Sequence, residues 1–282
     1  MSRNSRSLPR TLLCLAFVAL AGFALAACGD SEEEQALTFT LTEQGGEAKL
    51  SGPQSAETGL AEITLENETK GEGDMQLIRV EGDHSADEVV EGLGKAMQGQ
   101  PFPDWLFAAG GVGALPAGES ATVTQVLAPG TYYAANTEGG GPPKADALAA
   151  VEVTGDESDA EVGEGDGTVT AVDYDFEAEE LPSGEVEVDF VNDGEEPHHL
   201  IAAPLKGDAT AADVEQAIKT EKSEPPIEAK GIQGTAVIEG GEDQLVTLDL
   251  EPGRYALLCF ISDRQGGPPH ALKGMVAEVE VK

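Results

Sequence analysis

One strand pattern occurs twice in this chain, and this repeat constrains the fold more than any other feature of the sequence. The segment 59–67, GLAEITLEN, returns at 184–192 as GEVEVDFVN. Apolar and polar residues alternate in both copies, which is the signature of a β-strand with one buried face. Both copies end at an asparagine, Asn67 or Asn192, and a turn that contains glycine follows. Such a repeat predicts two domains of one fold.

Two further blocks recur in the same order. The block 127–132, LAPGTY, returns at 250–255 as LEPGRY, and its Pro-Gly pair is typical of a turn between strands. Each copy also contains a short amphipathic stretch, at 85–98 and 210–219, that predicts a helix. We therefore expect two domains, each a β-sandwich of short strands. Their expected bounds are 37–154 and 168–282, with an acidic linker at 155–167.

The first 27 residues have the pattern of an export signal. Three arginines, Arg3, Arg6 and Arg10, precede an acid-free apolar stretch at 11–27. That stretch is shorter than the roughly 20 apolar residues of a bilayer-spanning helix. It ends in LAACG, which resembles the lipobox of bacterial lipoproteins. This resemblance implies cleavage before Cys28, a lipid on its sulfur, and anchoring to the cell membrane outside the cytoplasm.

Two alternatives to a lipid anchor remain for the N-terminus: an uncleaved membrane anchor and a soluble secreted protein. Residues 28–36, which include the run SEEEQ, are expected to form an acidic, solvated tether.

The charge of the chain narrows its partners. Asp and Glu number 53 against 16 Lys and Arg, for a formal charge of −37. Removal of the signal takes three arginines and no acids, which leaves 13 bases and a charge of −40. This balance argues against nucleic acid and against binding to anionic lipid through a basic patch. It favours a basic protein partner, attracted by long-range electrostatics.

Only one thiol remains available in the exported chain. Cys14 leaves with the signal and Cys28 is expected to carry the lipid, so Cys259 has no partner for an internal disulfide. Three interpretations of Cys259 are open: a small buried core residue, a partner in an intermolecular disulfide, or a metal ligand.

The second copy carries a set of metal-binding residue types in a distinctive order. Pro197-His198-His199 follows its first clear strand, and the block 252–259, PGRYALLC, ends at Cys259, followed by His270 and Met275. This order resembles the blue copper (cupredoxin) family. The resemblance implies a Greek-key sandwich with one copper ion at its end. His198, Cys259 and His270 would be the strong ligands and Met275 the axial ligand.

The donor chemistry agrees with copper on independent grounds. A thiolate tolerates Cu(I), imidazoles tolerate Cu(II), and a weak thioether completes a trigonal site that serves electron transfer.

The second copy departs from the family pattern in two respects. Ten residues, 260–269, separate Cys259 from His270, where the family typically has a shorter loop. In addition, His199 lies beside the expected ligand. Because successive strand residues face opposite sides, only one of these two histidines should point into the site. We expect His198, which directly follows Pro197 as in the family, with His199 as the alternative.

The first copy lacks the ligand set. Met75, Asn136 and Lys144 stand where the second copy has His198, Cys259 and His270, so the first domain is expected to keep the fold without the metal chemistry. It also contains a run of aromatic residues at 101–107, which is either a partner-binding loop or a local core plug.

The sequence thus predicts an exported, lipid-anchored, cupredoxin-like protein that binds copper in its second domain. Its role would be electron transfer or copper handling at the cell envelope. The alternative is a metal-free, cupredoxin-like binding or structural lipoprotein in which Cys259 is a core residue. Nothing pairs a nucleophile with a base, so an enzyme is not expected.

Overall fold

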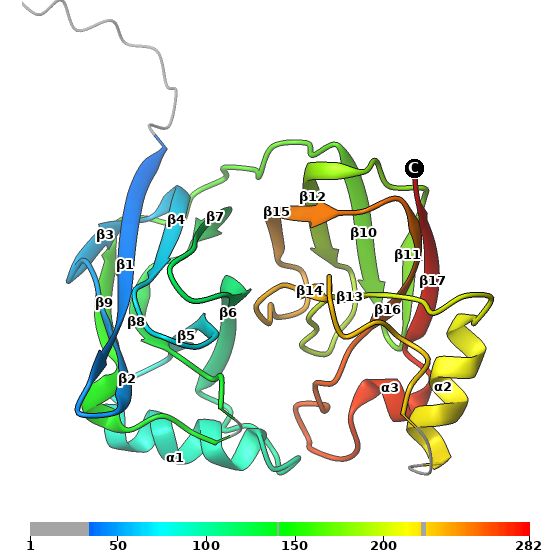
Figure 1. The fold of residues 1–282 in the computed structure, drawn as a ribbon. Coiled ribbons are helices and arrows are strands. Elements are labelled where there is room, and N and C mark those ends of the chain that lie inside the picture. Colours follow the sequence, from blue (N-terminus) through cyan, green and yellow to red (C-terminus); the bar gives the residue numbers. More distant parts are fainter. Residues whose placement is uncertain (1–33, 140, 221–223) are drawn as a thin grey trace, which may run out of the picture. The chain divides into compact units, whose positions relative to one another are not determined.

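The computed structural model describes residues 34–139, 141–220 and 224–282. Within these ranges the chain is an all-β sandwich fold with short helices, as the alternating sequence predicts (Figure 1). The export signal, Cys28 and most of the expected tether lie outside the described residues. None of the helices in the described ranges is long and apolar enough to cross a membrane.

The first repeat begins and ends with strands, and its helix α1 (Ala86–Ala96) follows β5. Ser85 caps this helix: its hydroxyl accepts the N–H of Glu88, whose carboxylate accepts the N–H of Ser85 in return. A 3₁₀ turn spans Ala145–Ala147. The strands are β1 (Gln35–Gln44), β2 (Glu47–Ser51), β3 (Ser55–Glu57), β4 (Gly59–Asn67), β5 (Gly73–Val80), β6 (Leu106–Leu115), β7 (Ser120–Leu127), β8 (Gly130–Ala135) and β9 (Ala149–Thr154).

The second repeat follows the same order, with helix α2 (Ala211–Thr220) after β13 and a one-turn helix α3 (His270–Lys273) before its last strand. Both longer helices therefore lie where the amphipathic stretches predict them. The strands are β10 (Gly167–Val172), β11 (Asp175–Ala178), β12 (Gly184–Asn192), β13 (Ile201–Pro204), β14 (Gln233–Gly234), β15 (Asp243–Leu250), β16 (Gly253–Leu258) and β17 (Val276–Val281).

The two repeats pair their strands in the same way. In the first, β1 runs parallel to β4, and β4 runs antiparallel to β7; in the second, β10, β12 and β15 repeat this arrangement. Strands β2 and β11 pair antiparallel with β1 and β10. The other strands form a facing sheet in each repeat, ordered β3-β9-β8-β5-β6 in the first and β14-β13-β16-β17 in the second. The repeated sequence blocks therefore occupy equivalent strands.

A single sheet runs through both repeats. Strand β15 pairs antiparallel with β7 through Leu245 opposite Thr124 and Val246 opposite Val123. The result is an eight-stranded sheet ordered β11-β10-β12-β15-β7-β4-β1-β2. In Figure 1, β7 and β15 lie between the strands of the first repeat and those of the second. The sequence did not predict whether the repeats would pack together.

Alternation along the strands builds the core. On β12 the side chains of Val186, Val188 and Phe190 are buried, and the residues between them are more exposed. Burial of each such side chain stabilises the fold by about 1.5–3 kcal/mol.

The repeated Pro-Gly-x-Tyr block forms a turn held by its tyrosine. The hydroxyl of Tyr255 donates to the carbonyl of Glu251, and that of Tyr132 donates to the carbonyl of Ala128. Each tyrosine thereby anchors the start of its strand, as in tyrosine corners of other sandwiches. In the second repeat this strand is β16, which leads directly to Cys259.

Candidate metal centre

The loop that carries His198 is fixed at the end of β12. Asn192, the last residue of that strand, is buried, and its side-chain amide donates to the carbonyls of Glu196 (2.9 Å) and Ile238 (3.1 Å). The backbone of His198 pairs with Ile238 in both directions, at 3.0 and 2.9 Å. These bonds turn the chain so that the imidazole of His198 is fully buried.

Cys259 directly follows β16, and the long loop after it returns His270 to the same place. The N–H of His270 donates to the carbonyl of Ile261 (2.8 Å), and that of Ala271 donates to the carbonyl of Cys259 (2.7 Å). The ten-residue loop therefore closes, and His270 begins α3 beside Cys259.

The side chains of His198, Cys259 and His270 converge. The sulfur of Cys259 lies 3.7 Å from Nδ1 of His198 and 3.6 Å from Nδ1 of His270, and the two Nδ1 atoms are 3.0 Å apart. All three residues have no exposed surface. These three donors are close enough to bind one ion.

Each imidazole is held by a carboxylate on its opposite nitrogen. Nε2 of His198 lies 2.8 Å from Oδ1 of Asp173, and Nε2 of His270 lies 3.0 Å from Oδ1 of Asp263. The carboxylates accept hydrogen bonds, so each Nε2 carries the proton and each Nδ1 presents a lone pair. Carboxylates in this position orient the rings and raise their basicity as ligands.

This protonation pattern fits a cation between the three donors. Two facing lone pairs 3.0 Å apart repel each other, and the single proton of the Cys259 thiol satisfies only one of them. A soft or borderline cation satisfies all three donors at once, and two imidazoles with one thiolate suit copper.

Burial keeps the donors neutral when no cation is bound. Desolvation raises the pKa of the Cys259 thiol to about 12. Desolvation, together with the nearby His198, lowers the pKa of His270 to about 4. Desolvation also lowers the pKa of His198. Both imidazoles are thus free of a second proton near neutral pH, and binding of a cation releases the thiol proton.

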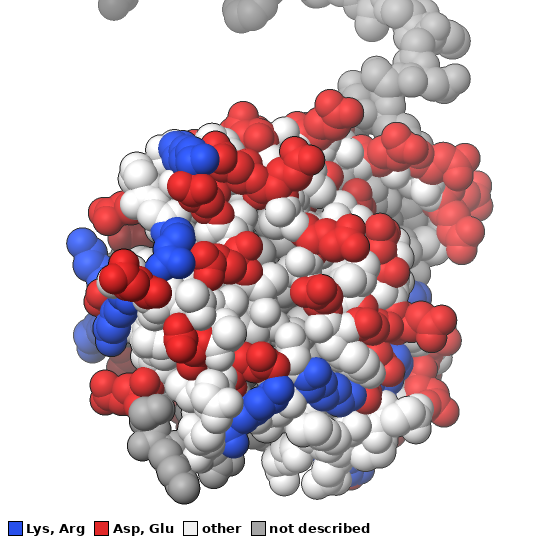
Figure 2. Space-filling view, turned by 90° about the vertical axis from the view of Figure 1, so that its right-hand side faces the viewer, with Lys and Arg blue, Asp and Glu red and all other residues white. Residues whose placement is uncertain are grey.

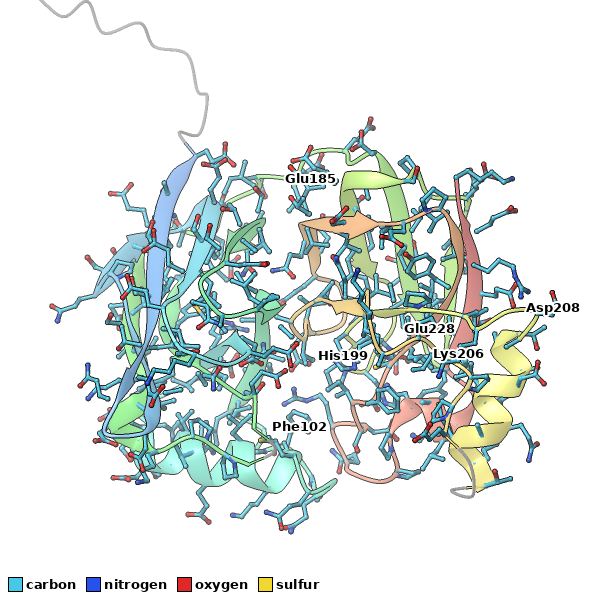
Figure 3. The ribbon with its side chains drawn as sticks, viewed as in Figure 1. Phe102, Glu185, His199, Lys206, Asp208 and Glu228 are labelled. Atoms are coloured by element: carbon cyan, nitrogen blue, oxygen red, sulfur yellow. The ribbon has the colours of Figure 1, made fainter. Side chains whose placement is uncertain are left out.

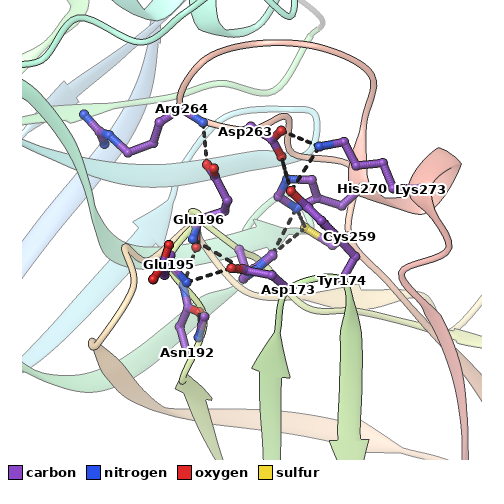
Figure 4. A network of polar contacts seen from close by, with 12 residues as sticks. Asp173, Tyr174, Asn192, Glu195, Glu196, Cys259, Asp263, Arg264, His270 and Lys273 are labelled. Carbon is purple, nitrogen blue, oxygen red and sulfur yellow. Dashed lines mark hydrogen bonds and ion pairs between the residues drawn. The ribbon is translucent and has the colours of Figure 1, made fainter.

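Asp263 is itself held by several groups (Figure 4). It accepts hydrogen bonds from Lys273, from the hydroxyl of Tyr174 (3.2 Å) and from His270. Desolvation opposes ionisation of Asp263, but the hydrogen bonds from Lys273 and His270 outweigh it and hold its pKa below the usual value. The ring of Tyr174 packs edge-on against His270, with centroids 5.0 Å apart. Asp263 therefore remains a charged acceptor for His270.

The two remaining predicted residues differ in their placement. Met275 is fully buried in the same apolar cluster as Cys259, and its N–H donates to the carbonyl of His270 (3.0 Å). Its axial role stays a prediction. His199 does not belong to the group of three converging donors. Its Nε2 accepts the N–H of Phe260 (2.9 Å), on the side that faces the first repeat (Figure 3).

The first repeat has no equivalent of this donor set among its described residues. Met75 is buried in the core, Asn136 accepts the N–H of Asp74 (2.9 Å), and Lys144 forms an ion pair with Glu47. None of these side chains supplies a thiolate or an imidazole.

Sequence reasoning missed the supporting carboxylates. Asp173 and Asp263 belong to no motif, and acids are so frequent in this chain that two more carry no signal. The available hint was the unusual length of the loop 260–269, which contains Asp263.

Comparisons with known proteins give structural likenesses only. No family model matches the chain, and no curated protein matches it. Among solved structures, auracyanin B is 26% identical and aligns over 41% of this chain and 86% of its own, with a TM-score of 0.28.

Two further structures show a similar degree of likeness. An azurin from Methylomonas sp. strain J is 19% identical over 41% of this chain and 95% of its own, with a TM-score of 0.26. A copper nitrite reductase from Nitrosomonas europaea is 15% identical over 89% and 94%, also with a TM-score of 0.26. These scores are too low to support a function. Any functional argument must therefore come from the three donors themselves.

Proposed function

We propose that this chain is an exported, cupredoxin-like electron-transfer protein that binds one copper ion through His198, Cys259 and His270, with Met275 as the axial ligand. The observation that carries the proposal is the convergence of one sulfur and two imidazole nitrogens, all buried, within 3.7 Å of one another. Copper, when bound, would supply one-electron redox chemistry between Cu(II) and Cu(I).

The residues around the donors restrict movement. Asp173 and Asp263 fix the ring orientations of His198 and His270, and Asp173 is held in turn by the N–H groups of Glu195 (2.9 Å) and Glu196 (3.3 Å). Donors that are already in place need little rearrangement when the charge of the site changes. The arrangement thus favours rapid electron transfer.

Electron transfer fits this geometry better than copper handling. Transfer of a metal ion to a partner requires access to the ligands, whereas His198, Cys259 and His270 have no exposed surface. Electrons need no such access. We therefore place copper handling second.

A titration with copper tests the proposal. The purified intact chain is titrated with Cu(II) under visible spectroscopy, and we expect one equivalent to produce an intense thiolate-to-copper band. Cys259→Ser should abolish the band, whereas His84→Ala, which changes a histidine that stacks on Trp105, should retain it. Absence of stoichiometric binding of both Cu(II) and Cu(I) would overturn the proposal and favour the metal-free alternative.

The location of the protein is part of the proposal. The lipobox-like sequence before Cys28 supports a lipid anchor on the outer side of the cell membrane. Membrane fractionation tests this: the unaltered protein should sediment with membranes, and Cys28→Ser should release it or block its maturation. Equal sedimentation of a fully processed Cys28→Ser protein would contradict lipid anchoring.

A basic protein is the partner that the surface charge favours. Figure 2 shows Asp and Glu spread over one face, with Lys and Arg gathered in its left and lower parts. Beside the metal centre, a cleft of about 800 Å³ lies between the repeats, and its lining contains carboxylates but neither Lys nor Arg among the described residues. Met97, Ile232 and Phe260 are exposed apolar side chains of this cleft. Because Phe260 follows Cys259, a basic partner that inserts an apolar side chain here would come close to the copper ligands.

A further inference from the structure

We infer that Arg264 couples the first repeat to the metal centre, so that the repeat without copper ligands positions the ligands of the other. The inference depends on the proposed copper site. It assigns a role to two features that the site does not explain: Arg264 in the long loop 260–269, and the aromatic segment 101–107.

The side chain of Arg264 reaches into the first repeat. Its Nη2 donates to the carbonyls of Leu106 (3.0 Å) and Pro103 (3.4 Å), and its guanidinium lies 4.9 Å from the ring centroid of Phe107 and 5.7 Å from that of Phe102. Arginine suits such a place because its planar group can donate several hydrogen bonds and stack on aromatic rings at once.

An ion pair strengthens this attachment. Nη1 of Arg264 lies 2.7 Å from Oε1 of Glu239, which also accepts the N–H of Ala108 on β6 (2.9 Å). The side chains of Arg264 and Glu239 are only 22% and 11% exposed. A charge pair at this depth is weakly screened by salt and strongly directional.

The loop backbone also binds to the first repeat. The N–H of Phe102 donates to the carbonyl of Arg264 (2.8 Å), and the N–H of Gly267 donates to the carbonyl of Gly99 (2.9 Å). At Gly266, which has a φ of +78°, a Cβ atom would lie 2.7 Å from the carbonyl oxygen of Gly99. The loop therefore packs against the segment 99–102 at a distance that only glycine permits.

Arg264 lies next to the groups that hold both imidazoles (Figure 4). The backbone N–H of Arg264 donates to Oε2 of Glu196 (2.6 Å). The backbone N–H of Glu196 donates in turn to Asp173, the acceptor for His198. Asp263, the chain neighbour of Arg264, is the acceptor for His270. Release of Arg264 from the first repeat would thus disturb both carboxylates together.

The expected consequence is a change in redox balance. Carboxylate acceptors raise the basicity of the imidazoles and so favour Cu(II) over Cu(I). If the loop loosens, this preference weakens and the reduction potential rises. Arg264→Ala should lower the ratio of Cu(II) to Cu(I) affinity about tenfold, which corresponds to a potential about 59 mV higher for one electron.

A matched arginine provides the control. Arg254 pairs with Glu278 (3.0 Å) and donates to the carbonyls of Gly207 and Ala209, all within the second repeat. Arg254→Ala therefore removes a similar ion pair without touching the first repeat, and it should leave the potential unchanged.

The test is a redox titration of the copper-loaded intact chain and its variants, with the thiolate-to-copper band and the thermal melting of the metal-free forms recorded alongside. We expect Arg264→Ala to raise the potential and shift the band, and Arg264→Lys, which keeps the charge opposite Glu239, to do so to a smaller extent. If Arg264→Ala fails to fold, the reduction potential of Arg264→Lys tests the inference: a rise supports it, and an unchanged potential overturns it.

Failure of this inference and failure of the proposed copper site give different results. A lower melting temperature with unchanged potential and band would show that Arg264 only stabilises the fold, and this would overturn the inference. Failure of the unaltered chain to form the band would overturn the proposed copper site instead.

Discussion

At the scale of single residues, the carboxylates behind the imidazoles determine what the three donors can bind. Asp263 and Asp173 set the tautomers of His270 and His198, and without them the rings could present either nitrogen. A ligand set identified by residue type alone therefore omits the carboxylates that orient the imidazole donors.

Replacement of one carboxylate by its amide tests this role. Asp263→Asn keeps the size of the side chain but removes the charge beside His270 and Lys273. We expect Cu(II) affinity to fall by about 10–100-fold, with a smaller loss for Cu(I) and hence a higher potential. Competition titrations for both ions measure the change. Asp213→Asn, which alters an exposed side chain in the first turn of α2, serves as the control, and equal effects of the two variants would contradict the role.

One acid that is neither a proposed copper ligand nor a hydrogen-bond partner of one should make stability depend on pH. Desolvation and the neighbouring Glu239 raise the pKa of Glu242 to about 7, although Arg79 opposes the shift. The folded-state pKa of Glu242 exceeds its unfolded value of about 4.5. The contribution of its protonated carboxyl to the free energy of unfolding is therefore complete below about pH 4.5 and is lost as the pH rises through about 7.

Denaturation in urea at pH 5 and pH 8 measures this dependence on the metal-free chain. Glu242→Gln should gain on the order of 2 kcal/mol relative to the unaltered chain at pH 8, and much less at pH 5. The nearby Asp243 remains in both proteins, so the difference between them isolates Glu242. A pH-independent difference would show that Glu242 ionises normally in the folded state.

At the scale of elements, the two repeats supply a control for each other. Asn67 ends β4 and Asn192 ends β12, and each side-chain amide donates to backbone carbonyls of the loops beside it. The same arrangement occurs in both, but only the loop after β12 carries a proposed copper ligand, His198.

Asn67→Ala and Asn192→Ala should each lower the free energy of unfolding, by about 1–3 kcal/mol, because buried carbonyls lose their donors. Only Asn192→Ala should also shift the thiolate-to-copper band, since it releases the loop that holds His198. Urea denaturation and visible spectra measure the two effects. A band shift of equal size in Asn67→Ala would contradict the separate role of the second loop.

The sequence predicted the positions of the strands and helices well, but it did not predict which strands pair across the two repeats. Alternation along 59–67 and 184–192 predicted β4 and β12, because a half-buried strand needs that pattern. The pairing of β7 with β15 was not predictable, because two edge strands that pair across repeats have the same alternation as any other strands. Likewise, the length of the loop 260–269 was visible, but its attachment to the segment 99–102 depends on contacts between residues far apart in sequence.

At the scale of the whole molecule, the negative charge should control encounter with redox partners. A formal charge of −37 over 282 residues attracts cations over distances set by the ionic strength, about 30 Å at 0.01 M salt and 3 Å at 1 M.

Small redox reagents test this without a known partner. A cationic cobalt(III) complex should oxidise the reduced protein fastest at low salt and slow several-fold as salt is added, because screening removes the attraction. Anionic hexacyanoferrate(III) should show the opposite trend. Stopped-flow growth of the thiolate-to-copper band, as Cu(I) is oxidised to Cu(II), measures both rates. The same salt dependence for the two reagents would contradict electrostatic control.

Electron transfer by this chain depends on His198, Cys259 and His270 binding one copper ion together, as proposed above. X-ray absorption at the copper edge of the singly loaded, intact chain measures the ligand atoms directly. We expect one short copper–sulfur distance and two imidazole nitrogens, with the sulfur lost in Cys259→Ser. A spectrum of the unaltered chain with only nitrogen and oxygen neighbours would show that Cys259 is not a ligand and would overturn the proposed site.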